Sequence, residues 1–128
     1  MTCKEIYNAA LHLIAQNDIK SDIRDYDERF PYLMATFCAE AEWLDDAYRA
    51  SHGKDIRGDY PVTSLGFGET FPLCDVFASA ASYYVAAMLI IDENETFSDS
   101  LFDKYSARMS SIADSLPMKN EPIKNIYP

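Results

Sequence analysis

The sequence is short of positive charge. Its 128 residues carry 11 Lys and Arg against 21 Asp and Glu, which gives a formal net charge of -10. A nucleic-acid clamp needs clustered Lys and Arg to neutralise phosphates, and docking on an anionic membrane needs them for the same electrostatic reason. The composition therefore argues against sequence-specific nucleic-acid binding and against membrane partners.

Cysteine and histidine are also scarce. Cys3, Cys38 and Cys74 are widely spaced and form no CxxC pair, so they predict neither a disulfide framework nor a zinc site and suit a reducing compartment. Any Ser-His or Cys-His dyad would have to use His12 or His52, and neither lies in a recognisable catalytic motif. We therefore predict no catalytic residue, no cofactor and no metal site.

A long apolar run is missing as well. The most apolar stretch, residues 76–91, contains two serines and is flanked by Asp75 and Asp92. A membrane-spanning helix needs about 20 apolar residues, so this stretch is predicted to be a buried core element. Residues 1–5 show no basic region followed by an apolar run, so we expect no signal peptide and a cytoplasmic location.

What the first half of the chain does contain is helical periodicity. Thr2 and Glu5 have the spacing of a capping box, and apolar residues then recur at the helical period to about Asn17. A second helical segment starts with the acidic cluster Asp22, Asp25, Asp27 and Glu28 and carries a long apolar stripe. Pro31 lies within this pattern, so the helix either starts there or is kinked there.

The second half predicts two more helices. Residues 71–91 are apolar almost all round, which is typical of a central helix packed on several sides. Ser98 is predicted to cap a fourth helix that stops at Pro117. Residues 53–70 hold all four glycines and form a long loop, in which residues 60–67 could pair as a short hairpin.

These patterns predict an all-α fold, a small bundle of about four helices with one long loop and an extended C-terminal tail. Residues 1–117 would form the helical domain, with its loop at residues 53–70, and residues 118–128 would form the tail. The side chains expected in the core are Phe37, Leu44, Phe77, Tyr84, Met88, Leu101 and Tyr105.

Acidic residues are the one group that could carry chemistry. Glu42, Asp45 and Asp46 lie close together on the second helix. Further acids surround the turn after the third helix: Asp92, Glu93, Glu95 and Asp99. All-α nucleotide pyrophosphohydrolases bind Mg²⁺ through paired acidic boxes, and here only half of one box, Glu42-x-x-Asp45, is present. A metal-dependent hydrolase of that kind is one alternative, and a solvated acidic helix face is the simpler interpretation.

Aromatic residues, with nine Tyr, seven Phe and one Trp, exceed what four core stripes require. Tyr and Trp are enriched at protein interfaces, although half-buried tyrosines would explain the same excess. Those outside or at the edges of the stripes are Tyr7, Tyr26, Tyr32, Trp43, Tyr60, Phe67 and Tyr83. The tail is apolar yet cannot continue a helix, so it either folds back or docks on a neighbour. The predicted protein interface consists of Tyr60, Phe67, Ile123, Ile126 and Tyr127.

Five segments of the sequence, taken in their order along the chain, are similar to a known protein family. They are DIRDYDERFPYL (22–33), AEAEWLDDAYR (39–49), FPLCD (71–75), ASAASYYVAAMLI (78–90) and LFDKY (101–105). In this order they resemble the small helical head-tail connector (adaptor) proteins of tailed bacteriophages and prophages, which form a ring beneath the portal. The likeness covers most of residues 2–127.

The resemblance implies a non-enzymatic virion component, made in the cytoplasm of the bacterial host, that oligomerises at the portal and links capsid to tail. Its partners would be the portal protein and neighbouring copies of itself, contacted through residues 53–70 and 118–128. Acidic channel walls would repel passing DNA rather than bind it. The sequence shows no strongly apolar exposed stripe that would set a ring geometry, and a small regulatory module that binds another protein stays an alternative.

Overall fold

The computed structural model describes residues 1–15, 23–57 and 63–117. Within them the helical elements, in chain order, are α1 (Cys3–Ala15), α2 (Ile23–Ser51), the short 3-10 helix η1 (Asp75–Phe77), α3 (Ala78–Ile90) and α4 (Glu95–Asp114). These described ranges contain no strand, only an isolated antiparallel bridge between Thr2 and Thr70. The all-α prediction is confirmed, whereas the hairpin is not formed over residues 63–67, the part of it that is described.

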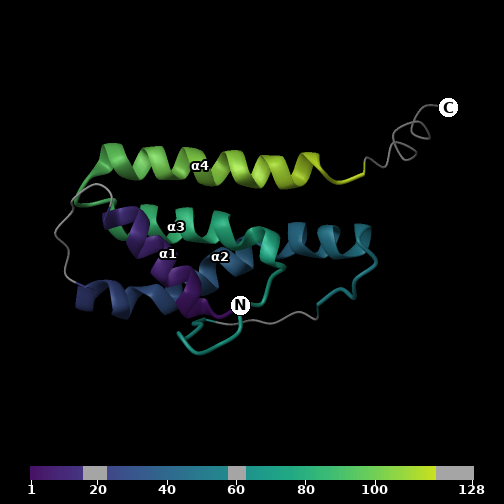
Figure 1. The fold of residues 1–128 in the computed structure, drawn as a ribbon, viewed down its shortest axis with the longest axis horizontal. Coiled ribbons are helices and arrows are strands. Elements are labelled where there is room, and N and C mark those ends of the chain that lie inside the picture. The colour runs from purple at the N-terminus through teal and green to yellow at the C-terminus, as the bar shows by residue number, and fades with distance from the viewer. Residues whose placement is uncertain (16–22, 58–62, 118–128) are drawn as a thin grey trace.

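Helix α3 lies at the centre, between α4 on one side and α1 and α2 on the other (Figure 1). Nine of its 13 residues are buried, and none of the 13 is charged. Such a helix is stable only when other elements cover it on several sides. The central position predicted for residues 71–91 is therefore confirmed, although α3 itself begins at Ala78, after η1. None of the described helices is long and apolar enough to cross a membrane.

The core contains the side chains that the periodicity predicted. The fully or almost fully buried ones are Phe37, Leu44, Phe77, Tyr84 and Leu101. Met88 and Tyr105 pack against them from the edge and are half-buried. The ring of Tyr84 joins α2 to α4, because its centroid lies 5.8 Å from that of Phe37 and 5.4 Å from that of Tyr105. Aromatic pairs at these distances stabilise a core beyond the area that they bury.

The starts of α1 and α2 follow their sequence signals. The Thr2 hydroxyl accepts from the Glu5 N–H at 3.3 Å, and the Glu5 carboxylate accepts from the Thr2 N–H at 3.1 Å, so the capping box is formed. Helix α2 begins at Ile23, which places Pro31 inside it rather than at its start. Proline has no N–H to donate, so one backbone hydrogen bond is missing within α2.

The start of α4 differs from the prediction. Its cap is Asn94, whose side chain accepts from the Phe97 N–H at 3.0 Å. Ser98 is wrong as the cap because Asn94 already begins the helix one turn earlier. Ser98 is instead fully buried, and its hydroxyl donates to the Ala87 carbonyl of α3 at 2.9 Å.

The last four carbonyls of α3, the groups that a helix leaves without internal partners, all accept hydrogen bonds. The Ala87 carbonyl accepts from the Ser98 hydroxyl, and the Ile90 carbonyl accepts from the N–H groups of Glu93 and Asn94. The carbonyls of Met88 and Leu89 both accept from the Arg29 guanidinium. Arg29 reaches its two carbonyls from α2 at 2.9 and 3.3 Å. A cation also suits the negative end of the helix dipole.

At the start of α1 the backbone N–H groups need acceptors, and the loop after α2 supplies them. The Cys3 N–H donates to the Glu69 carbonyl at 2.9 Å, and the Lys4 N–H donates to the Phe67 carbonyl at 3.0 Å. These are first-turn donors with no partner inside the helix. The described end of the loop is therefore held against the domain.

Replacing Asn94 by alanine is expected to lower the free energy of unfolding by about 1 kcal/mol, because the cap of α4 is lost. The control is Ser100→Ala, an exposed change in the first turns of the same helix. Chemical denaturation of both variants checks this, and equal losses would contradict the assignment of Asn94 as the cap.

Candidate functional site

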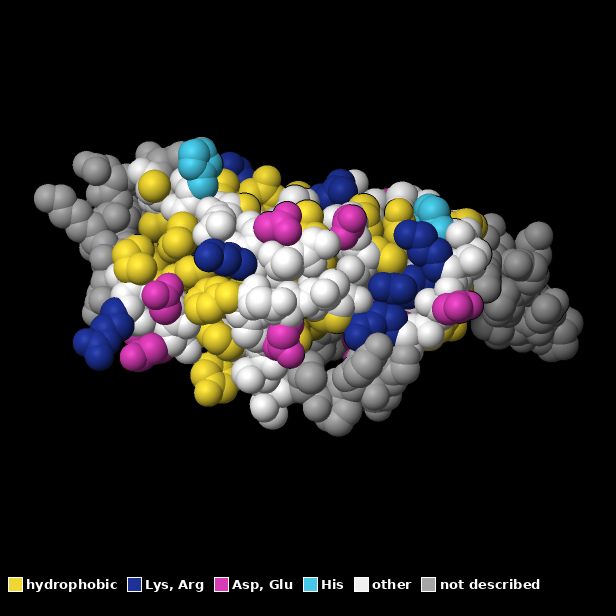
Figure 2. Space-filling view, turned by 60° about the horizontal axis from the view of Figure 1, so that its bottom comes forward, with side chains coloured by type: hydrophobic (Ala, Val, Ile, Leu, Met, Phe, Trp, Pro, Cys, Tyr) yellow, Lys and Arg dark blue, Asp and Glu magenta, His cyan; other side chains and the backbone are white. Residues whose placement is uncertain are grey.

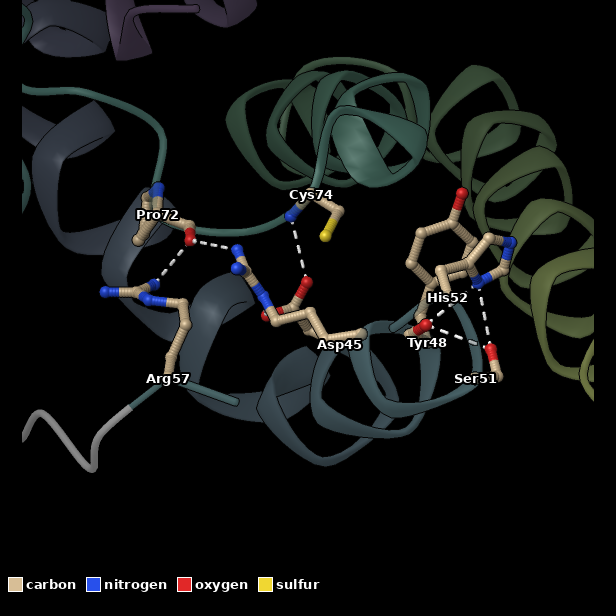
Figure 3. Close-up of polar contacts among 8 residues, drawn as sticks. Asp45, Tyr48, Ser51, His52, Arg57, Pro72 and Cys74 are labelled. Carbon is tan, nitrogen blue, oxygen red and sulfur yellow. Dashed lines mark hydrogen bonds and ion pairs between the residues drawn. The ribbon is translucent and has the colours of Figure 1, made fainter. Parts of the chain in front are cut away.

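Asp45, one of the candidate metal ligands, lies where α2 meets the segment that leads into η1 (Figure 3). Its side chain is only 1% exposed. Oδ2 accepts from Nε of Arg49 at 2.8 Å, and Oδ1 accepts from the Cys74 N–H at 2.9 Å. A carboxylate is tolerated in a protein interior when it is both paired with a cation and hydrogen-bonded.

The position of Asp45 gives it a structural role. Cys74 directly precedes η1, where N–H groups have no helical partner and the dipole is positive. Asp45 therefore satisfies the N-terminal end of the η1–α3 segment, as Arg29 satisfies its C-terminal end. Both side chains come from α2.

Two arginines meet at a carbonyl beside Asp45. Arg49 donates to the Pro72 carbonyl at 3.2 Å, and Arg57 donates to the same oxygen at 2.6 Å (Figure 3). Desolvation disfavours the charge on Arg49, but the hydrogen bond and the charge of Asp45 outweigh it, so the pKa of Arg49 is raised. The two cations hold residues 57 and 72, the two sides of the loop, next to each other.

The metal hypothesis depends most on Asp45, and the contacts described above already engage its carboxylate. Both oxygens of Asp45 already accept hydrogen bonds, and the neighbouring Arg49 would repel a cation. In the second acidic group, Glu93 accepts from the Tyr26 hydroxyl at 2.8 Å. Across the described ranges, no three His, Cys, Asp or Glu side chains come together as metal ligands. The acidic residues singled out in the sequence are thus not assembled into one site.

Ser51 and His52 are in contact at the C-terminal end of α2. Nδ1 of His52 lies 2.9 Å from the Ser51 hydroxyl and 2.9 Å from the Tyr48 carbonyl, and the His52 ring stacks on that of Tyr48 at 4.0 Å (Figure 3). The Ser51 hydroxyl also donates to the Tyr48 carbonyl, at 2.9 Å. The tautomer of His52 sets which of Ser51 Oγ and His52 Nδ1 donates in their contact. Both side chains lie against the Tyr48 carbonyl and help to satisfy the helix terminus.

All three cysteines are buried and free. Burial, with a smaller effect of Glu69, raises the pKa of the Cys3 thiol to about 11. Burial likewise raises the pKa of Cys38 to about 12, and burial and the contact with Asp45 raise that of Cys74. Because the thiolate is the reactive form, these groups behave as small apolar side chains.

Among the predicted interface residues, only Phe67 is described; Tyr60, Ile123, Ile126 and Tyr127 lie outside the described residues. The ring centroid of Phe67 lies 5.1 Å from that of Tyr7 and 5.4 Å from that of Phe30. Phe67 thus packs, half-buried, against the domain's own core. A role for Phe67 in binding another protein stays a prediction.

Two other aromatic candidates point to solvent from α2. Tyr32 is 61% exposed and Trp43 is 68% exposed, whereas Tyr7 and Tyr26 of the same candidate set are buried. Ala39 lies between them at helical spacing, also exposed and opposite the core-facing side of the helix.

We call Tyr32, Thr36, Ala39 and Trp43 the outer stripe of α2. A shallow groove accompanies it, lined by Tyr32, Ala35, Thr36, Ala39, Glu40 and Thr63. Sequence periodicity missed this surface because acidic residues interrupt it. The only available signal was the position of two aromatic residues off the core stripe.

Comparison with known proteins finds no matching family model, no matching curated protein and no matching solved structure.

Replacing Asp45 by alanine is expected to lower the free energy of unfolding by about 2–3 kcal/mol, because it leaves the Cys74 N–H without its acceptor and the partly exposed Arg49 guanidinium without its carboxylate. Asp25→Ala is the matched control, since Asp25 and Arg29 have the same i, i+4 spacing but an exposed 3.3 Å contact. That loss should stay below about 1 kcal/mol. Chemical denaturation measures both, and equal losses would contradict a structural role for Asp45.

The native thiols are expected to resist a thiol reagent at pH 8 and to react fully after unfolding, because burial keeps them protonated. Stability should fall as the pH rises from 9.0 toward about 12, since the unfolded chain releases these protons first. Reagent titration and denaturation at several pH values measure both effects. Rapid labelling of the folded chain would contradict the burial.

Proposed function

We propose that the protein is a structural, non-enzymatic component of phage or prophage particles, a head-tail connector (adaptor) that oligomerises at the portal and links capsid to tail. It would be made in the cytoplasm of the bacterial host and assembled into the virion. The observation that carries the proposal is the outer stripe of α2, where Tyr32 and Trp43 stand exposed on a helix whose other face forms the core. Exposed aromatics beside a shallow groove are typical of surfaces that bind proteins.

The charge of the chain supports the same role. Acids outnumber bases by 21 to 11. On the face drawn in Figure 2, Asp and Glu side chains are scattered among Lys and Arg side chains, several of which lie together toward the right-hand end. The net charge of -10 makes the chain as a whole repel phosphate, which suits a protein beside a channel through which DNA slides.

The polar contacts also favour assembly over hydrolysis. Asp45 is used in the fold, which leaves Glu42 and Asp46 without the third carboxylate that the metal-dependent alternative requires. A regulatory module, the other alternative, would use the outer stripe of α2 for a different partner. Binding to the portal protein is the property that distinguishes a connector from such a regulatory module.

Deleting residues 118–128 is expected to weaken co-assembly with the portal protein encoded in the same phage or prophage genome and to leave the helical content unchanged. The physical reason is the loss of Ile123, Ile126 and Tyr127, apolar side chains that can anchor an interface. Co-sedimentation with the portal ring and circular dichroism measure the two effects.

The matched control keeps the tail and changes its polar residues, Asn120→Ser with Asn125→Ser. Co-assembly that is unaffected by the deletion would contradict the role of the tail. A full-length chain that does not bind the portal would contradict the connector proposal itself.

A further inference from the structure

We propose that the outer stripe of α2 binds a second copy of the chain head to tail, and that the surface it meets there is the basic patch formed by Lys54, Ile56 and Arg57. The inference rests on the proposed function and deepens it, because it assigns the two surfaces through which copies would join. It needs no contact with the portal, so the two proposals can fail separately.

The outer stripe combines an apolar anchor with acidic borders. Trp43, 68% exposed, is its largest side chain. Glu40 and Glu42 flank the stripe on opposite sides, because residues two apart lie about 160° apart around a helix. Glu40 is exposed and Glu42 is partly exposed. A surface of this composition favours an apolar partner that carries positive charge.

The basic patch has the opposite character. Ile56 is 60% exposed, and Lys54 beside it is exposed as well. The backbone of Lys54 is held by a 2.8 Å hydrogen bond to the Arg49 carbonyl, and Arg57 is held by the Pro72 carbonyl at 2.6 Å. Within residues 54–57 the two cations exceed the single acid, Asp55. The patch thus presents an exposed apolar side chain beside the exposed Lys54 and the partly exposed Arg57.

The two surfaces do not overlap, so one copy can use both at once. Trp43 and Arg49, which lies behind the basic patch, are about 120° apart around α2 and about 9 Å apart along it. Residues 54–57 follow beyond the end of the helix.

Charge favours a head-to-tail contact over a symmetric one. If outer stripe met outer stripe, Glu40 and Glu42 of the two copies would come together, and like charges at an interface oppose binding. Outer stripe against basic patch pairs opposite charges instead. Repeated, such a contact between two different surfaces generates a ring when its rotation closes, which is the symmetry that a connector requires.

The first test is self-association of the full-length chain at low salt, measured by sedimentation equilibrium up to millimolar concentration. Trp43→Ala and Ile56→Ala should each weaken the association constant by at least about 30-fold, the effect of losing a central anchor. Ile91→Ala is the matched control, since Ile91 is an exposed isoleucine outside both surfaces. A chain that stays monomeric, or a loss with Trp43→Ala but not with Ile56→Ala, would overturn the proposal.

The second test is charge reversal followed by mixing. Glu40→Lys with Glu42→Lys gives a chain whose two surfaces are both positive, and Lys54→Glu gives a chain whose two surfaces are both negative. Each alone should associate more weakly than the original chain. An equimolar mixture should recover association, because every junction then pairs opposite charges. Thermal unfolding of each variant confirms that it is folded.

No recovery on mixing would overturn the head-to-tail contact, as would a Lys54→Glu chain that associates as well as the original. If recovery fails while deletion of residues 118–128 still abolishes co-assembly with the portal, this inference falls and the connector proposal stands. If recovery succeeds and the full chain never binds a portal, the self-association surface stands and the connector proposal falls.

Discussion

The central helix α3 can be buried because two charged side chains of α2 satisfy its polar ends. Arg29 donates to carbonyls at its C-terminal end, and Asp45 accepts from the Cys74 N–H ahead of its N-terminal end. Along α2 these two residues are about 24 Å apart, and the chain from Cys74 to Leu89 rises by nearly the same length if helical. The match sets α2 and α3 antiparallel in one register. Without it, several buried backbone groups would lose their partners, each at a cost of about 1–3 kcal/mol.

How much of this fold was predictable depends on how local the signal is. Periodicity identified α3 as the central helix, and the Thr2–Glu5 spacing identified the start of α1, because both depend on neighbours in sequence. The Arg29 and Asp45 contacts join residues 60 and 29 positions apart, and no local pattern encodes such pairing. Asn94 and Ser98 are both good capping residues, and their packing against α3 decided between them.

The candidate site shows the same division. A carboxylate at position 45 is equally consistent with a metal ligand and with a helix partner, and only the Cys74 N–H and the Arg49 guanidinium beside it distinguish the two. The outer stripe was hidden for a different reason, since Glu40 and Glu42 interrupt its apolar residues in sequence. Helix α2 thus has two roles. Its inner side packs in the core and stabilises the fold, and its outer side is the surface that we assign to assembly.

The central claim is that Asp45 ties α2 to the start of η1 and α3 and is not held ready for a ligand. Native-state hydrogen exchange of the Cys74 amide in the full chain tests it most directly. If Asp45 holds that amide, its opening free energy should equal the global free energy of unfolding, because the contact breaks only when α2 and α3 separate. Exchange at the low opening free energy of an exposed loop amide would contradict the account.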